Sequence, residues 1–255
     1  DPKFIGADFY VMSYVEGRVL DSVTLPALQP SERAAAYLSL NETMAALHSV
    51  DPDTVGLGDL ASARSRRSSH IGRQVRAWDR QYQASILGEG DVTQGPIRRV
   101  RDWLLANLPT QRATTLVHND FKIDQCIFHP TEPRVIAVVD WEMCTLGDPL
   151  VDFFYCYEPW LLEAGLAGPE EGLTLCQSPY DSKSNLVEGI PSLDALLLDY
   201  ARRSPTIAYP LPRSERVVYE TFALWRSACI LKSIKARYVR GTTLATHVDI
   251  PEPVM

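Results

Sequence analysis

The chain has 255 residues and a formal net charge of −7, from 25 Lys and Arg against 32 Asp and Glu. This length predicts one large domain or two modest ones, and its apolar and charged fractions, 45% and 22%, are typical of a folded soluble protein. A pI near 5.3 argues against a nucleic-acid-binding protein, whose binding face is usually basic. No apolar run is long enough to cross a bilayer, so no membrane partner is expected.

The cysteines number five, and no two of them have the spacing C-x-x-C. An odd count without such pairs disfavours a disulfide framework or a zinc site, and it favours a reducing, cytoplasmic location. The chain starts at Asp1 without a secretory signal pattern, and removal of an upstream segment stays open.

The first half of the chain predicts one strand followed by three helices. Aromatic and β-branched residues over 9–15 (FYVMSYV) predict a strand that ends at a Glu-Gly turn. Apolar residues at helical spacing, each group preceded or opened by Ser or Pro, predict helices over 31–50, 69–87 and 96–108, with Ser31 as the first N-cap. Pro and Gly over 51–60 predict a loop between the first two helices.

The second half predicts a small group of strands followed by three helices. The strands are expected over 114–118, 126–129 and 135–140, and the helices over 148–162, 192–203 and 214–240, with a long irregular loop over 163–191. Strand and helix do not alternate as they do in βαβ units. The pattern therefore predicts an α+β fold that is mainly helical and carries a small β-insert.

Polar side chains gather where the predicted strands begin and end. His118, Asn119 and Asp120 close the first strand of the insert, Gln125 opens the second, and Asp140 closes the third. A hairpin-like arrangement would bring Asp120, Gln125 and Asp140 to one rim. Two carboxylates and an amide oxygen are hard ligands that suit Mg²⁺ bound together with a phosphorylated substrate.

The spacing of these residues matches a template for phosphoryl transfer, H-R-D-x-x-x-x-N followed by an Asp that holds Mg²⁺. On this template Asp120 accepts the proton of the attacking hydroxyl, and Asp140 and Gln125 hold the metal. Lys122 is placed to stabilise charge on the transferring phosphoryl group. An isolated H-x-D is a weak signal, whereas the joint pattern is much more specific. Three neighbours are candidate supporting residues: His118 to orient the loop, Asp124, and Glu142 as a ligand of a second metal.

The stretch HNDFKIDQCIFHPTEPRVIAVVDWEMCTLGDPLVDF, residues 118–153, resembles the signature of the aminoglycoside phosphotransferase and choline kinase superfamily. It is most similar to the branch found as the kinase domain of acyl-CoA dehydrogenase family members, which reads H-G-D-F-R-L-D-N, V-L-D-W-E and T-L-G-D-P. The resemblance includes FYVMSYVEGRVL, GIPSLDALLLDYARR and the last helix, and so covers nearly the whole chain. It implies a protein-kinase-like fold, with a mostly helical large lobe whose β-insert carries the catalytic loop.

The same resemblance implies a nucleotide site at the hinge, where backbone groups of Met12, Ser13, Tyr14 and Val15 would hydrogen-bond the adenine of ATP. Ser13 replaces the usual Glu, which matters little for main-chain contacts. Residues 1–15 would then be the last small-lobe strand and the hinge, and residues 16–255 the large lobe.

Three departures from the family pattern stand out. Asn119 replaces a Gly, and Asn tolerates unusual backbone angles. Gln125 replaces the metal-binding Asn, which moves the carbonyl oxygen by roughly one bond, ~1.5 Å. The small lobe, with its phosphate-covering loop and its Lys, has no counterpart before the hinge. We therefore expect a fragment of a longer kinase, with a natural short form that binds without phosphorylating as the competing hypothesis.

The function predicted from these patterns is ATP- and Mg²⁺-dependent phosphoryl transfer to a hydroxyl of a small molecule. The resemblance favours a hydroxyacyl-CoA as the acceptor, and the alternative acceptor is an aminoglycoside, choline or another amino alcohol. Two other classes stay open: a non-catalytic pseudokinase module whose metal site is weakened by Gln125, and a metal-dependent phosphohydrolase. The oligomeric state is not predicted.

Two further features have alternative interpretations. Asp148 precedes Pro149, which predicts a helix N-cap rather than a catalytic carboxylate. An arginine-rich stretch is either a solvated helix face or a surface that recognises a phosphorylated substrate such as a CoA moiety. Its members are Arg64, Arg66, Arg67, Arg73, Arg76 and Arg80.

Overall fold

The computed structural model describes residues 2–6, 9–62, 65, 68–88, 91–162, 177–204, 207 and 209–242. Its described helices are α1 (Pro2–Ile5), α2 (Pro30–His48), α4 (His70–Ala84), α5 (Gln94–Ala106), α6 (Pro149–Cys156), α7 (Leu193–Arg203) and α8 (Arg213–Val239). The strands are β1 (Arg18–Val19), β2 (Thr115–Val117), β3 (Cys126–Phe128), β4 (Val135–Val138) and β5 (Thr145–Gly147). Short 3₁₀ turns are η1 (Gly58–Leu60), η2 (Ile123–Gln125), η3 (Trp141–Met143) and η4 (Glu158–Leu161).

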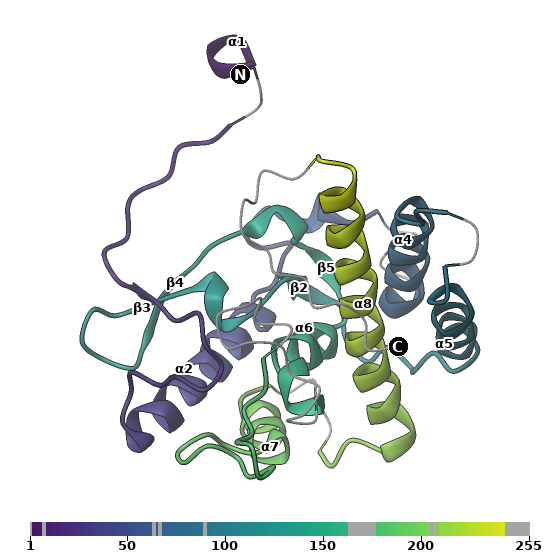
Figure 1. Ribbon diagram of the computed structural model, residues 1–255. Coiled ribbons are helices and arrows are strands. Elements are labelled where there is room, and N and C mark those ends of the chain that lie inside the picture. Colours follow the sequence, from purple (N-terminus) through teal and green to yellow (C-terminus); the bar gives the residue numbers. More distant parts are fainter. Residues whose placement is uncertain are drawn as a thin grey trace.

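The predicted α+β class with mainly helical content is confirmed, and helices form in all six predicted regions (Figure 1). Ser69 caps α4, since its hydroxyl accepts the Gly72 N–H at 3.2 Å. The predicted N-cap of the first long helix is wrong by two residues. Helix α2 begins at Pro30 and its N-cap is Gln29, because the Glu32 carboxylate accepts the Gln29 N–H at 2.9 Å and closes the first turn.

The strand predicted over residues 9–15 does not form. These residues run as extended chain away from the body of the molecule (Figure 1), and among the described residues no strand pairs with them. Pattern and propensity favour a strand here, but a strand is stable only where a neighbour accepts and donates its backbone hydrogen bonds. Pairing starts just beyond, at β1, where Gly17 lies so close to β3 that a Cβ would stand 2.5 Å from the Phe128 carbonyl oxygen.

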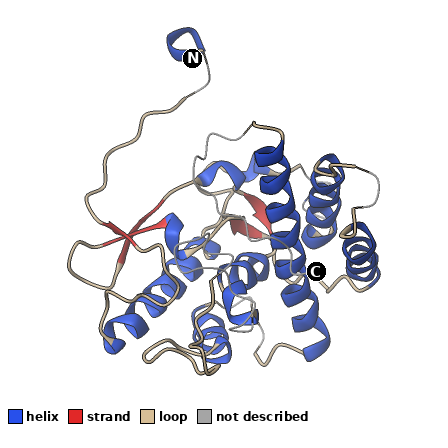
Figure 2. Ribbon diagram, viewed as in Figure 1, coloured by secondary structure: helices blue, strands red, loops and turns tan. Residues whose placement is uncertain are grey.

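The described strands form two small antiparallel sheets, in the orders β1-β3-β4 and β2-β5 (Figure 2). Strands β3 and β4 are the predicted hairpin, with Cys126 opposite Val138. Strand β5 was not predicted, and it pairs with β2 so that Val117 lies opposite Thr145. Consequently the loops that leave β2 and β4 both reach the region between the two sheets.

The core lies under these loops and is made by helices. Helix α8 packs against α4, α5 and α6, while α2 packs against α7. All eight residues of α6 are buried, and the ring of Tyr157, which follows this helix, contacts Phe153 and Trp160 at centroid distances of 4.9 and 5.2 Å. Since α6 is packed on every side, polar groups that it carries are fixed in place.

Two remaining expectations concern the chain after α6. Residues 163–176 of the predicted loop lie outside the described residues, and residues 177–191 are irregular as expected, with one isolated bridge between Tyr180 and Leu186. Among the described residues, no helix is both long and apolar enough to span a membrane.

Candidate active site

The loop after β2 is held by a buried carboxylate of α6. Asp152 accepts the backbone N–H of His118 at 2.6 Å and that of Asn119 at 2.7 Å, and it also contacts Nε2 of His48 at 3.2 Å. Burial by itself would raise the pKa of Asp152, but the hydrogen bonds from His48 and the two amides hold this pKa below its ordinary value. The loop backbone is therefore anchored to an ionised group in the core.

His118 is fully buried, and both of its ring nitrogens bond to backbone. Nε2 donates to the Val139 carbonyl at 2.8 Å, and Nδ1 accepts the Asp120 N–H at 3.2 Å. The ring also lies against Trp141, with a centroid distance of 4.8 Å. His118 thus joins the loop after β2 to the end of β4, and it is placed to orient the loop.

Asn119 stands at the sharpest point of this loop, with φ at +65°. Asn is one of the few residues that adopt this left-handed conformation readily, which explains how it can stand where related sequences have Gly. Its side-chain amide donates to the backbone carbonyl of Met143 at 3.1 Å, and the backbone carbonyl of Asn119 accepts a hydrogen bond from Arg226. The loop is therefore tied to α8 as well as to α6.

The guanidinium of Arg226 is buried between two rings. It lies 5.0 Å from the Trp78 centroid and 3.9 Å from the Tyr155 centroid, which is cation–π geometry. Sequence reasoning missed Arg226. The signal that could have found it is a charged residue among the apolar Phe222, Trp225 and Cys229 of α8.

Asp120 and Lys122 lie together at the partly exposed end of the loop. Lys122 Nζ stands 3.7 Å from Asp120 Oδ1 and 3.8 Å from Asp124 Oδ2. The Tyr155 hydroxyl faces Asp120 from below: burial raises its pKa, Arg226 opposes the rise, and the Asp120 carboxylate adds to it. The three predicted residues of this loop are therefore brought together, with a cation beside the carboxylate.

A second buried acid lies behind this group. Glu158, at the start of η4, is 2% exposed, and its Oε2 has no hydrogen-bond partner within the described part of the chain. Burial raises the pKa of Glu158 to about 8, although the Ser227 hydroxyl and the cations Lys122 and Arg226 counteract it. Glu158 is consequently protonated over much of the neutral range.

Gln125 and Asp140 lie at the facing ends of the β3–β4 hairpin. The backbone carbonyl of Gln125 accepts the Val139 N–H at 3.0 Å, and Asp140 is the next residue after Val139. Asp140 has φ +69° and ψ +50°, a left-handed turn that ends the strand. The carboxylate of Asp140 raises the pKa of Glu142 through a shared hydrogen bond and repulsion, and Asp120 contributes a smaller repulsion. Three carboxylates therefore act on one another at this rim.

The side chains at this rim can be compared with the ligands that a magnesium ion requires. Within the part of the chain that is described, no three His, Cys, Asp or Glu side chains form a complete metal site. Mg²⁺ is usually held by one or two carboxylates, with substrate phosphates and water filling the other positions. Asp140 and the amide of Gln125 are donors of this kind on neighbouring ends of one hairpin, and a cation would relieve the repulsion between Asp140 and Glu142.

The predicted hinge is separate from this group. Met12, Ser13 and Tyr14 are exposed and Val15 is half-buried, and among the described residues no hydrogen bond or ion pair joins them to the catalytic loop. The role of Met12–Val15 in nucleotide binding stays a prediction.

Asp148 has the structural role that its Pro neighbour predicts. It is the N-cap of α6, and its carboxylate accepts the Leu150 N–H at 3.1 Å and the Tyr219 hydroxyl at 2.7 Å. Burial raises the pKa of Asp148 to about 6. Of the arginine-rich stretch, the last three members lie on α4 and the first three, Arg64, Arg66 and Arg67, lie outside the described residues.

Comparison with known proteins identifies the group to which this chain is related. A profile described as "Phosphotransferase enzyme family" matches residues 1–173. The chain belongs to this family. Acyl-CoA dehydrogenase family member 11 of Homo sapiens is 36% identical over 244 residues, which is 94% of this chain and 28% of the human protein. The chain thus spans less than a third of that relative.

Two solved structures place the fold within the family. A protein from Ralstonia eutropha JMP134, titled as a proposed aminoglycoside phosphotransferase, is 34% identical with a TM-score of 0.77, over 96% of this chain and 69% of that one. Choline kinase from Cryptosporidium parvum is 10% identical with a TM-score of 0.51, over 90% of this chain and 71% of that one, and shows likeness of fold alone. These matches confirm the kinase-like fold and the predicted relation to aminoglycoside phosphotransferases and acyl-CoA dehydrogenase family members.

Proposed function

We propose that this chain forms the catalytic lobe of an ATP- and Mg²⁺-dependent phosphotransferase that acts on a hydroxyl of a small molecule. The observation that carries the proposal is the loop from His118 to Lys122. Its backbone is clamped by Asp152 and Arg226, so the Asp120 carboxylate and the Lys122 ammonium, 3.7 Å apart, project from a rigid base. Preorganised charges of this kind are the main protein contribution to phosphoryl transfer.

The residues divide the chemistry between them. Asp120 accepts the proton of the acceptor hydroxyl as that oxygen attacks the γ-phosphorus, and the O–P bond to the nucleoside diphosphate breaks. Lys122 offsets the negative charge that spreads over the transferring group. Asp140 and Gln125 would hold Mg²⁺, which supplies neutralisation of the phosphate charge when bound. Glu142 and Asp124 support the same rim, and His118 keeps the loop in register.

Nucleotide binding is assigned to the start of the chain. We place the adenine at backbone groups of Met12, Ser13, Tyr14 and Val15, with residues 1–15 as small-lobe strand and hinge and residues 16–255 as the large lobe. The family profile matches from residue 1 onward, which supports including residues 1–15 in the kinase-like part of the chain. Residues 9–14 are exposed, and no backbone hydrogen bond joins residues 9–15 to other described residues, which leaves these donors and acceptors available to a ligand. The enzyme is placed in the cytoplasm, in keeping with the four free cysteines described.

A hydroxyacyl-CoA is the acceptor that we propose first. The support is that curated relatives at 33–41% identity are named as acyl-CoA dehydrogenases or members of that family. An aminoglycoside, choline or another amino alcohol is the second acceptor class, supported by the name of the Ralstonia protein.

The test is an assay of ADP release with ATP, Mg²⁺ and each acceptor class, on the wild-type chain and on Asp120→Asn. Phosphorylated acceptor formed by the wild type and lost in Asp120→Asn supports the kinase. Nucleotide binding without turnover under all conditions would instead identify a pseudokinase module. Phosphate release that needs no acceptor would identify a phosphohydrolase.

A further inference from the structure

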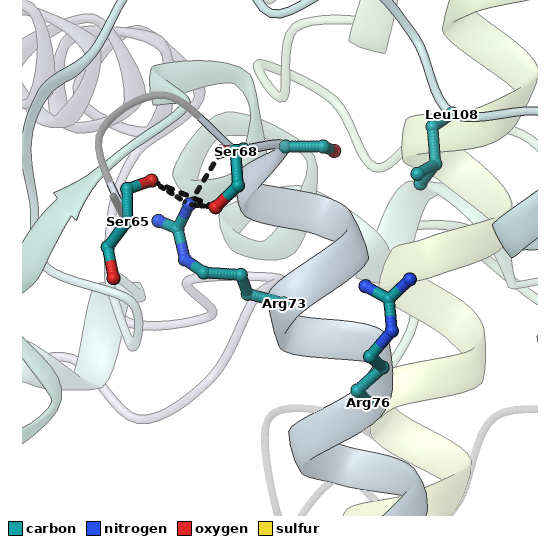
Figure 3. A pocket seen from close by; sticks show the side chains of 6 residues that line it. Ser65, Ser68, Arg73, Arg76 and Leu108 are labelled. Carbon is teal, nitrogen blue, oxygen red and sulfur yellow. Dashed lines mark hydrogen bonds between the residues drawn. The ribbon is translucent and has the colours of Figure 1, made fainter. Parts of the chain in front are cut away.

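A pocket of about 420 Å³ opens at the start of α4, and none of the proposed catalytic, metal or hinge residues lines it. Its volume is within the range of small-molecule sites. Five of its six lining residues carry a hydroxyl or a guanidinium group (Figure 3); the six are Ser65, Ser68, Ser69, Arg73, Arg76 and Leu108.

Arg73 forms a fixed wall of the pocket. Its guanidinium donates to the Ser68 carbonyl at 2.6 Å and the Ser68 hydroxyl at 3.0 Å, and also to the Ser65 carbonyl (Figure 3). A further nitrogen donates to the carbonyl of Leu146 in β5 at 3.3 Å. All of these acceptors are neutral, and among the described residues no acid pairs with Arg73.

Arg76 supplies the second cation, and it is exposed. One of its nitrogens donates to the Gly72 carbonyl at 2.8 Å, and no other hydrogen bond or ion pair of its side chain exists among the described residues. Gly72 leaves room for this arrangement, because a Cβ there would stand 3.3 Å from that Arg76 nitrogen and 3.1 Å from Leu108. The nearest acid on the helix, Asp79, is paired with Arg101 at 3.1 Å and does not neutralise Arg76.

We propose that this pocket binds a phosphate-bearing part of the acceptor substrate. Two guanidinium groups that have no acidic partner in the described part of the chain, set among serine hydroxyls, are donors suited to phosphate oxygens. The site lies on a chain of net charge −7, so its positive charge is local rather than general. The chemical class of ligand is an organic phosphate ester or diphosphate.

The pocket is connected to the catalytic loop through the β2–β5 pair. Leu146, which Arg73 contacts, lies opposite Leu116 in β2, and Asp120 follows Leu116 by four residues. Four residues of extended chain span at most ~14 Å. In this proposal, one elongated molecule has its phosphate at the pocket and its hydroxyl at Asp120. This assignment of the acceptor rests on the proposed phosphotransferase function.

The test compares Arg76→Ala with Arg80→Ala, an exposed arginine one turn further along α4 that does not line the pocket. Affinities for CoA, dephospho-CoA and ATP are measured by calorimetry on the full chain at constant ionic strength. We expect Arg76→Ala to weaken CoA binding about tenfold, as loss of one charge-assisted contact would, and to leave ATP binding and the melting temperature unchanged. Arg80→Ala is expected to change none of these values.

Three outcomes would overturn the proposal: no CoA binding by the wild type, equal weakening by the two variants, or weakened binding of ATP rather than of CoA. A KM for hydroxyacyl-CoA that Arg76→Ala leaves unchanged in an active enzyme would also refute it, while the phosphotransferase function would stand. Conversely, CoA affinity that depends on Arg76 without any ATP-dependent phosphorylation would retain the pocket and reject the proposed function. The dephospho-CoA arm separates recognition of the 3′-phosphate from that of the diphosphate.

Discussion

The catalytic loop and the segment 9–15 are both parts of the predicted site, and the structure treats them in opposite ways. The loop that begins at His118 carries mostly polar side chains, yet its first residues are buried. Asp152 in α6 accepts the N–H groups of His118 and Asn119, and Arg226 in α8 donates to the Asn119 carbonyl. The segment is built from apolar residues, yet Val11 is 87% and Tyr14 90% exposed.

The difference shows that order at a site is set by long-range partners rather than by side-chain type. Buried backbone N–H groups must find acceptors, and a carboxylate that satisfies two of them fixes the loop at the same time. Residues 9–15 have the composition of a strand but, among the described residues, no backbone neighbour. The following predictions test how strongly each region depends on its partners, from the largest expected effect to the smallest.

Asp120→Asn should abolish most of the activity while leaving the fold unchanged. Loss of a general base at a preorganised site lowers kcat by about 10²–10⁴-fold. The measurement is ADP release with acceptor present, and thermal unfolding should be the same as in wild type because Asp120 is partly exposed. The matched control is Asp102→Asn on α5, which should keep full activity. Turnover in Asp120→Asn at the wild-type rate would remove Asp120 from the mechanism.

Asp152→Ala should give the largest loss of stability. It leaves two buried amides and His48 without their acceptor, at roughly 1–3 kcal/mol for each unsatisfied group. The pKa of Asp152 is lower in the folded protein than in the unfolded chain. Its contribution to stability is therefore complete at pH values above the unfolded pKa, ~4, and is lost as the pH falls through the folded pKa. Urea unfolding at pH 7 measures the effect, with exposed Asp21→Asn as the control. A change below about 0.5 kcal/mol would contradict the clamp.

Glu158→Gln should make the protein more stable at pH 8. The folded pKa, about 8, is raised from an ordinary 4.5, so the contribution of Glu158 is complete below pH 4.5 and is lost as the pH rises toward 8. Each unit of difference corresponds to ~1.4 kcal/mol, so the effect is a few kcal/mol at most. For the variant, the free energies of unfolding at pH 5.5 and at pH 8 should be similar. For the wild type, the value at pH 8 should be lower than that at pH 5.5. Exposed Glu188→Gln should behave like wild type at both pH values.

Arg226→Lys should weaken the hold of α8 on the catalytic loop. The charge is kept, but the planar group that stacks on Trp78 and Tyr155 and reaches the Asn119 carbonyl is lost, at about 1–2 kcal/mol. If Arg226 positions the loop, kcat should fall with little change in the KM for ATP. A loss of stability with unchanged kcat would mean that Arg226 supports the core alone.

Tyr14→Ala should have the smallest effect on stability, within about 0.5 kcal/mol, because the side chain is 90% exposed and packs on nothing described. Its effect on ATP affinity should also be small if the adenine contacts are main-chain. Tyr14→Pro removes the backbone N–H and should weaken ATP binding if this residue donates to the adenine. Equal ATP affinity in both variants would exclude a hydrogen bond from the Tyr14 N–H.

The sequence by itself determined the elements that depend on local pattern. Apolar periodicity predicted the long helices to within a few residues. The order H-x-D, Gln, D-W-E predicted that Asp120, Gln125 and Asp140 would lie at one rim, with Lys122 beside Asp120. The Asp-Pro pair likewise predicted the cap of α6. These signals extend over a few residues, which is the range over which helical spacing, turns and motif spacing are defined.

Only the tertiary structure decided what holds and surrounds that rim. Asp152 lies 34 residues from the amide of His118, and Arg226 lies 107 residues from the carbonyl of Asn119. Such contacts depend on how α6, α8 and the two sheets pack, and no local pattern encodes them. The same packing buried Glu158 near Lys122 and placed Arg73 and Arg76 at one pocket, while residues 9–15 found no strand partner among the described residues. The residues of the proposed site were visible in the sequence, whereas their environments arose from the fold.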